Sequence, residues 1–147
     1  MPPKFSLQTV LDVRHTRVET LEIELGGLLS AQKEGKEMLS ALQTNLSEVF
    51  CSLQEAQSGE LDLFKIDHLR ANIKEIQNRM AQVKQALAIL EGRIVDKQKE
   101  LVAAKQAEET LKTIKTKESE RFKFEMARAE NKQQDDVYIS QAFRNRL

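Results

Sequence analysis

The sequence predicts an all-α protein in which two long helices form an antiparallel coiled-coil hairpin, with a second helix that is longer and overhangs the first. Three observations predict this fold. Apolar residues recur about every 3.5 residues in two long runs, and one short polar segment separates these runs. The composition is that of long helices, because charged residues make up 31% of the chain, aromatic residues only 5%, and both prolines lie at the start.

The first run predicts a helix over residues 5–56. Steps of alternately four and three residues from Leu7 reach fourteen positions, of which eleven are aliphatic. An ordinary α-helix drifts by ~20° per heptad against such a pattern, so the constant phase predicts a left-handed coiled coil. These positions, the first seam, are Leu7, Leu11, Arg14, Val18, Leu21, Leu25, Leu28, Gln32, Gly35, Leu39, Leu42, Leu46, Val49 and Leu53.

A turn is predicted over residues 57–63. Ser, Gly and Asp cluster here between two periodic runs, which is typical of a chain reversal. Gly59 is the best candidate for the residue that ends the first helix. Ser58 or Asp62 is the expected cap of the helix that follows.

The second run predicts a helix over residues 64–140, followed by a frayed C-terminal tail. From Ile66 the same steps reach fourteen positions, of which twelve are apolar. After Leu111 the apolar residues keep no single phase, but Gly and Pro are absent after Gly92, so the helix is expected to continue. The second seam consists of Ile66, Leu69, Ile73, Ile76, Met80, Val83, Leu87, Leu90, Ile94, Lys97, Leu101, Ala104, Glu108 and Leu111.

The two seams are predicted to pack on each other in a single domain over residues 1–147, because a lone helix cannot bury an apolar stripe. If Leu53 faces Ile66, facing residues have numbers that sum to about 119–122. This register places Arg14 opposite Glu108, and these two charges are predicted to pair and to set the register. The other polar or small seam residues are matched as follows: Lys97 with Glu22 and Glu24, and Gln32 and Gly35 with Val83 and Leu87.

The same register leaves about thirty residues of the second helix without a partner inside the chain, a length of about 45 Å if helical. Apolar side chains without an internal partner suggest an external one. The alternative is a frayed or folded-back tail. The candidate partner-binding residues are Phe5, Leu7, Phe122, Phe124, Tyr138 and Phe143.

The sequence carries no motif of an enzyme, a cofactor site or a metal site. Its 23 Lys and Arg balance 23 Asp and Glu, so the chain as a whole has no electrostatic drive toward nucleic acid or an anionic membrane. Neither a signal peptide nor a transmembrane helix is expected. His15 and His68 are interpreted as solvent-facing flank residues, and Cys51 as a surface thiol.

Two terminal segments resemble those of a known family. The opening Phe5-Ser-Leu7-Gln-Thr-Val-Leu11-Asp-Val-Arg14 resembles the F-x-L-x-x-(x)-L-x-x-R start of the flagellar FliJ family. The closing Arg128-Ala-Glu130-Asn-Lys132-Gln-Gln-Asp135-Asp136 resembles the E-x-K-x-x-D-E segment near the end of those proteins, with Asp136 in place of the usual Glu. Length and two-helix plan also agree, so the resemblance covers nearly the whole chain.

The resemblance implies a non-enzymatic cytoplasmic component of flagellar or type III protein export, peripheral at the inner membrane at most. Members of the family look like the central stalk of rotary ATPases: they insert their paired helix ends into a hexameric ATPase ring, promote its assembly and contact the membrane export gate. By that analogy the ring grips the end that carries Phe5, Leu7 and the overhang after Ile114.

Two alternatives from other functional classes remain. The first is a scaffolding coiled coil unrelated to export, which dimerises through its leftover apolar surface. The second is a prefoldin-like holdase, which needs strands between its helices. The connection at residues 57–62 is too short for a β-hairpin, so this alternative ranks low.

Overall fold

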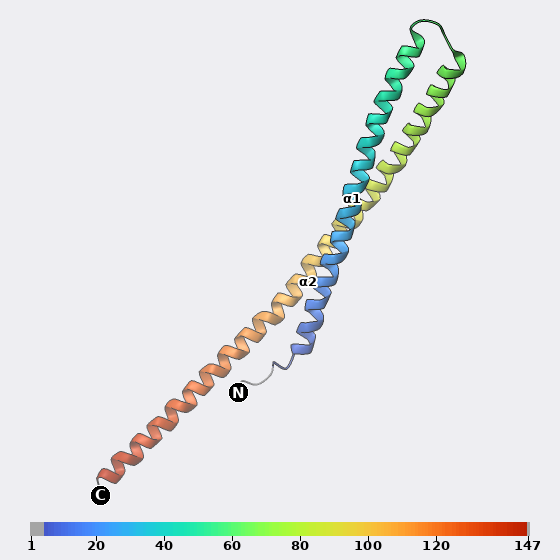
Figure 1. Cartoon of the computed structure of the whole chain (residues 1–147). Helices are drawn as coiled ribbons and strands as arrows, with labels where there is room; N and C mark the ends of the chain where they lie inside the picture. Colours follow the sequence, from blue (N-terminus) through green and yellow to red (C-terminus); the bar gives the residue numbers. More distant parts are fainter. Residues whose placement is uncertain (1–4, 147) are drawn as a thin grey trace. The chain divides into compact units, whose positions relative to one another are not determined.

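The computed structural model describes residues 5–146, which form two long helices joined by a short turn (Figure 1). Helix α1 spans Gln8–Gln57 and helix α2 spans Leu63–Asn145. Residues 5–146 contain no strand. The two helices pack on each other in antiparallel directions, which confirms the predicted fold class.

The ends of the helices differ slightly from the expected bounds. Helix α1 begins at Gln8 rather than at residue 5, because the first helical hydrogen bond runs from the Leu11 amide to the Leu7 carbonyl at 2.9 Å. Helix α2 continues to Asn145, five residues beyond the expected end, so residues 141–145 of the expected frayed tail are helical. This continuation follows from the absence of Gly and Pro after Gly92, since these residues are the strongest helix breakers.

The turn is built from the polar residues that predicted it. Gly59 has a φ of 112°, a conformation that glycine adopts without steric cost, directly after the end of α1. Asp62 caps α2, because its carboxylate accepts the amides of Phe64 at 3.1 Å and Lys65 at 3.2 Å. Ser58 instead donates its hydroxyl to the Glu55 carbonyl at 3.1 Å and completes the end of α1.

The hairpin expected as a single domain divides into two compact parts. The inner part is Thr20–Leu101, and the terminal part combines Met1–Glu19 with Val102–Leu147, of which residues 5–19 and 102–146 are described. Because a side chain in a two-helix pair contacts only residues near its own level, a long hairpin has no single central core. Each part therefore has its own set of packed residues.

The inner part is held by seam residues of both helices. Its tightest cluster joins Val49 of α1 to Ile73, Ile76 and Met80 of α2, all at most 8% exposed. Partly buried leucines pack around this cluster and extend it along both helices: Leu39, Leu42, Leu46, Leu53 and Leu69. At about 25 cal/mol per Å² of buried apolar surface, this stripe is the main source of stability of the part.

The periodicity located the contact surface of both helices. Every predicted seam residue except Leu7 is buried or half-buried, while most other side chains are exposed. The expected match of a small residue with a bulky one is also confirmed, since a Cβ atom at Gly35 would lie 2.6 Å from Leu87 Cδ2. The observed register therefore agrees with the predicted one.

Candidate functional site

The terminal part contains a polar cluster where α1 meets α2. Glu108 lies on the second seam and is only 6% exposed, although it is charged. The Oε1 atom of Glu108 lies 2.7 Å from His15 Nδ1 and 3.0 Å from Lys112 Nζ. The other ring nitrogen of His15 lies 2.9 Å from Glu19 Oε1. The imidazole thus bridges one carboxylate of each helix.

This arrangement shifts the titration of both groups. The hydrogen bond that His15 donates to Glu108, followed by the charges of Glu108 and Glu19, raises the pKa of His15 above its ordinary value of 6.5. The hydrogen bond from His15, followed by that from Lys112, lowers the pKa of Glu108 below its ordinary value of 4.5. The protonated imidazole donates from both nitrogens, so the cluster is strongest between these two ordinary values.

Arg14 and Glu108 lie at neighbouring levels, as the register predicts, but the expected ion pair between them is replaced by two other contacts. Arg14 Nη1 donates a hydrogen bond to the backbone carbonyl of Ala107 at 2.7 Å. Glu108 is occupied by His15 and Lys112. Arg14 is half-buried, whereas His15 is exposed and still reaches Glu108. A register-setting role for Arg14 and Glu108 stays a prediction.

The contact of His15 with the other helix was not predicted from the sequence. Its side chain is 54% exposed, which agrees with a flank position, but exposure does not prevent it from joining the two helices. A signal was available, because Glu19 stands four residues after His15 on the same helix face. The pattern of apolar residues alone cannot predict a contact between polar side chains such as His15 and Glu108.

Beyond Leu111 no described side chain of the second helix is buried. Every side chain from residue 112 to residue 146 is exposed except that of Phe122, which is half-buried. In Figure 1 this segment, coloured orange to red, continues past the start of α1. We call residues 112–145 the overhang. At 1.5 Å per residue it is about 50 Å long.

The candidate partner-binding residues lie at this end of the molecule with different degrees of exposure. Phe124, Tyr138 and Phe143 are 68%, 73% and 66% exposed, so their rings face water. Phe122 and Phe5 are half-buried, and Leu7 is 39% exposed. The overhang therefore exposes large apolar side chains but no continuous stripe, since these residues share no single heptad phase.

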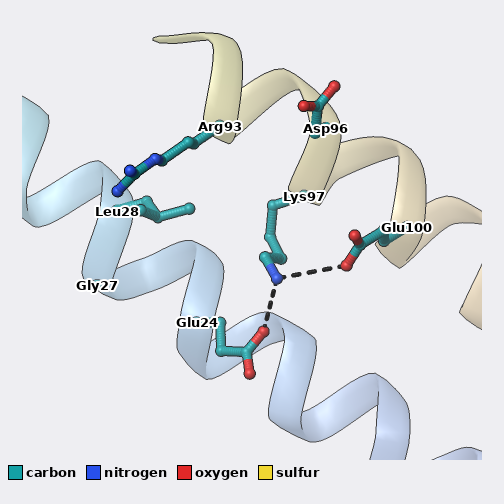
Figure 2. Close-up of a pocket in the computed structure, with 7 residues that line it drawn as sticks. All are labelled: Glu24, Gly27, Leu28, Arg93, Asp96, Lys97 and Glu100. Atoms are coloured by element: carbon teal, nitrogen blue, oxygen red, sulfur yellow. Dashed lines mark hydrogen bonds and ion pairs between the residues drawn. The ribbon is translucent and has the colours of Figure 1, made fainter. Parts of the chain in front are cut away.

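The inner part carries a second polar contact across the helices, shown in Figure 2. Lys97 Nζ lies 2.8 Å from Glu24 Oε2 and 3.3 Å from Glu100 Oε2. The hydrogen bond to Glu24 is the main cause that raises the pKa of Lys97 above its ordinary value. The predicted approach of Lys97 to Glu24 is thus confirmed.

A further apolar cluster, at the turn, was not predicted. Leu61, Leu63 and Phe64 are 63%, 68% and 91% exposed. None of them lies on either seam, and the turn was predicted only as a connection between the helices. Their exposure could have been predicted from the sequence, because these residues are apolar but lie outside both seams.

The described residues offer little for other kinds of chemistry. No group of three or more His, Cys, Asp and Glu among them could hold a metal ion. Neither of the two helices has a stretch that is long and apolar enough to cross a membrane. Cys51 is exposed and free, as its position off the seam predicted.

Comparison with known proteins decides the family. The model of the family described as "Flagellar FliJ protein" matches residues 3–147. The chain belongs to the FliJ family. This match includes both terminal segments that resemble FliJ proteins, and it covers the polar cluster and the overhang. No curated protein and no solved structure gives a significant match.

Membership of the FliJ family gives the functional class of the chain. It is a coiled-coil component of flagellar protein export, in a family that is non-catalytic and acts with other proteins of the export system. In this FliJ-family chain the geometry agrees with such a class, because it offers exposed side chains along two long helices.

Proposed function

We propose that this FliJ-family chain acts in the cytoplasm as a central-stalk-like partner and assembly factor of a hexameric export ATPase. The terminal part would enter the ATPase ring, with the overhang as its main contact. The observation that carries the proposal is the overhang itself, a helix of about 50 Å with large apolar side chains in water.

The exposed rings are suited to protein recognition. Aromatic side chains dominate the energetics of protein interfaces because each buries a large apolar area at a small cost in conformational entropy. Phe124, Tyr138 and Phe143 are distributed along the overhang, so they would contact a ring at several depths. Contacts spread along and around a helix suit a channel formed by several subunits better than a single flat surface.

The polar cluster supports the same proposal from the other side. It joins α1 to α2 just before the overhang begins, through Glu108 and His15, so the two helices enter a partner as a pair. Leu11, Val18 and Leu111 are each at most 7% exposed and pack in the same part. A rigid paired base would orient the overhang.

The decisive experiment uses the purified chain and the export ATPase of the same organism. The chain alone should hydrolyse no ATP, but it should promote hexamer formation in light scattering and raise ATP turnover by the ring. The triple variant Phe124→Asp, Tyr138→Asp, Phe143→Asp should lose both effects, because charged side chains oppose burial. Far-UV circular dichroism checks that its helices remain.

A matched control places the same charge at exposed apolar positions outside the overhang. The variant Ile23→Asp, Met38→Asp, Ile89→Asp changes residues that are 76%, 57% and 55% exposed, and it should retain the full effect on the ATPase. If assembly and turnover are the same with and without the chain, the proposal is wrong. A mass that rises with concentration for the chain alone would instead favour the dimerising scaffold.

A contact with the membrane export gate is the second element of the proposed role. If the overhang binds the ring, the turn is an exposed apolar surface that remains free for the gate, because Leu61, Leu63 and Phe64 are 63%, 68% and 91% exposed. Binding of the cytoplasmic domain of the gate to the chain, measured by calorimetry, should survive the triple overhang variant. Loss of gate binding in that variant would contradict this division of surfaces.

A further inference from the structure

Three of the five glycines have no role in the packing of the described structure. Gly59 forms the turn, and Gly35 makes room for Leu87. A Cβ atom at Gly26, Gly27 or Gly92 would meet nothing within 4 Å, and none of these glycines has a positive φ. Alanine would fit at all three positions.

Glycine inside a helix weakens it, because the unfolded backbone of glycine has more freedom to lose. The equilibrium of helix formation is reduced roughly fivefold for each glycine relative to alanine. Gly26 and Gly27 are consecutive in α1, and Gly92 lies inside α2. Each helix is therefore locally less stable at its glycines, although the packing of the helices does not require glycine there.

These glycines lie at nearly the same level of the inner part. Glu24 contacts Lys97 and Gly35 contacts Leu87, so facing residues have numbers that sum to about 121 or 122. Gly26 and Gly27 then face positions 95 and 96, and Gly92 lies one helical turn away, about 5 Å along the axis. Three glycines in two helices are thus concentrated within one turn.

The seam at this level combines the buried Ile94, which is 5% exposed, with a charged position. Lys97, a charged residue, occupies a seam position and pairs with Glu24 and Glu100 (Figure 2). A hollow of about 550 Å³ lies beside these residues and is also lined by Gly27, Leu28 and Arg93. By contrast, the cluster of Val49, Ile73, Ile76 and Met80 in the same part is purely apolar. The charged seam position interrupts the apolar stripe, which lowers the cost of local opening.

We infer that the level of Gly26, Gly27 and Gly92 is a bending point of the coiled coil, at which both helices flex together. The Lys97 contacts permit bending without exposing a large apolar surface, because an ion pair re-forms in water. This inference is independent of the proposed partner.

Hydrogen exchange of the full-length chain tests the inference. Amides of residues 23–31 and 89–97 should exchange faster than those of residues 39–53 and 69–83, which serve as an internal reference. The variant Gly26→Ala, Gly27→Ala, Gly92→Ala should slow exchange at the glycine level by roughly tenfold or more, with a smaller change in the reference segments. Equal protection of both regions in the natural chain would overturn the inference.

A control variant separates bending from a general gain in helix stability. Ser40→Ala, Ser47→Ala, Asn78→Ala adds three alanines at exposed positions away from the glycines. It should leave the exchange rates of residues 23–31 and 89–97 nearly the same as in the natural chain, while exchange near the new alanines slows. If it slows exchange at the glycine level as much as the glycine variant does, the level is not special and the inference is wrong.

Distances between spin labels give a direct measure of bending. In a Cys51→Ser background, Thr16→Cys and Glu37→Cys place labels on either side of the glycines in α1, about 31 Å apart along a straight helix. The distance distribution should be broad in the natural sequence and distinctly narrower after the three glycine-to-alanine changes. Equal widths in the two proteins would contradict a bending point.

Discussion

Two stretches of α2 are both rich in charged residues, yet they behave differently. Between Ile66 and Leu111 apolar residues occupy twelve of the fourteen heptad positions on one face, and that face is buried or half-buried against α1. In the overhang the apolar residues are as large but out of phase, and nearly all of them are exposed. The comparison shows that phase, rather than hydrophobicity alone, decides whether a residue of this chain serves the fold or remains for a partner.

The largest expected contrast is between a buried residue and an exposed one in the same helix. Ile76→Ala removes a side chain that is 4% exposed and should lower the free energy of unfolding by about 2–5 kcal/mol. Phe124→Ala removes a ring that is 68% exposed and should change it by less than about 0.5 kcal/mol. Urea denaturation followed by circular dichroism measures both values. Similar losses for the two variants would break the comparison.

A medium effect is expected where the seam depends on a close approach. Gly35→Leu should destabilise the chain by about 1–3 kcal/mol, because the new side chain would overlap Leu87 Cδ2. Leu87→Ala creates a space at the same level, so the double variant should be more stable than the sum of the two single effects predicts. Additive effects in a double-mutant cycle would show that these residues are not in contact. Ser40→Leu, at an exposed position, is the control.

The smallest expected effect is the pH dependence of the polar cluster. The pKa of His15 is raised, so its contribution to stability is complete below about pH 6.5 and is lost as the pH rises through the folded value. The pKa of Glu108 is lowered, so its contribution is present above about pH 4.5 and is lost as the pH falls through the folded value. Amide exchange of residues 8–19 should therefore accelerate between neutral and mildly alkaline pH beyond the intrinsic effect of hydroxide.

The His15→Gln variant is the control for this titration. Gln keeps a polar side chain near Glu108 but does not titrate, so the additional acceleration of residues 8–19 should disappear. Residues 39–53 of the inner part should show only the intrinsic pH effect in both proteins. An unchanged pH dependence in His15→Gln would show that the cluster does not hold α1 in place.

The fold could be predicted almost completely from the sequence, because a heptad pattern specifies which face of each helix is buried and which turn joins them. The seam residues, Gly59 and the match of Gly35 with Leu87 all follow from spacing and residue size. Contacts of long polar side chains could not be predicted in the same way. Arg14 and Glu108 lie at neighbouring levels as expected, but each has a choice of partners within reach, and the backbone carbonyl of Ala107 and the His15 ring are better placed.

The candidate site was predictable as a location but not as a set of contacts. The register indicates that the second helix extends beyond the start of the first, and this extension is the overhang. The heptad pattern reports contacts within the chain and not contacts with another protein. Phe122, Phe124, Tyr138 and Phe143 therefore stay predictions for the interface. The exposed residues Leu61, Leu63 and Phe64 were missed for a related reason, since a turn carries no periodicity from which exposure can be read.

The most direct measurement is hydrogen exchange of the chain alone and in complex with the export ATPase. The overhang should exchange quickly in the free chain and become strongly protected in the complex, while residues 63–101 stay as they are. Equal exchange of residues 112–145 in the free and the bound chain would contradict the assignment of these out-of-phase apolar residues to a partner.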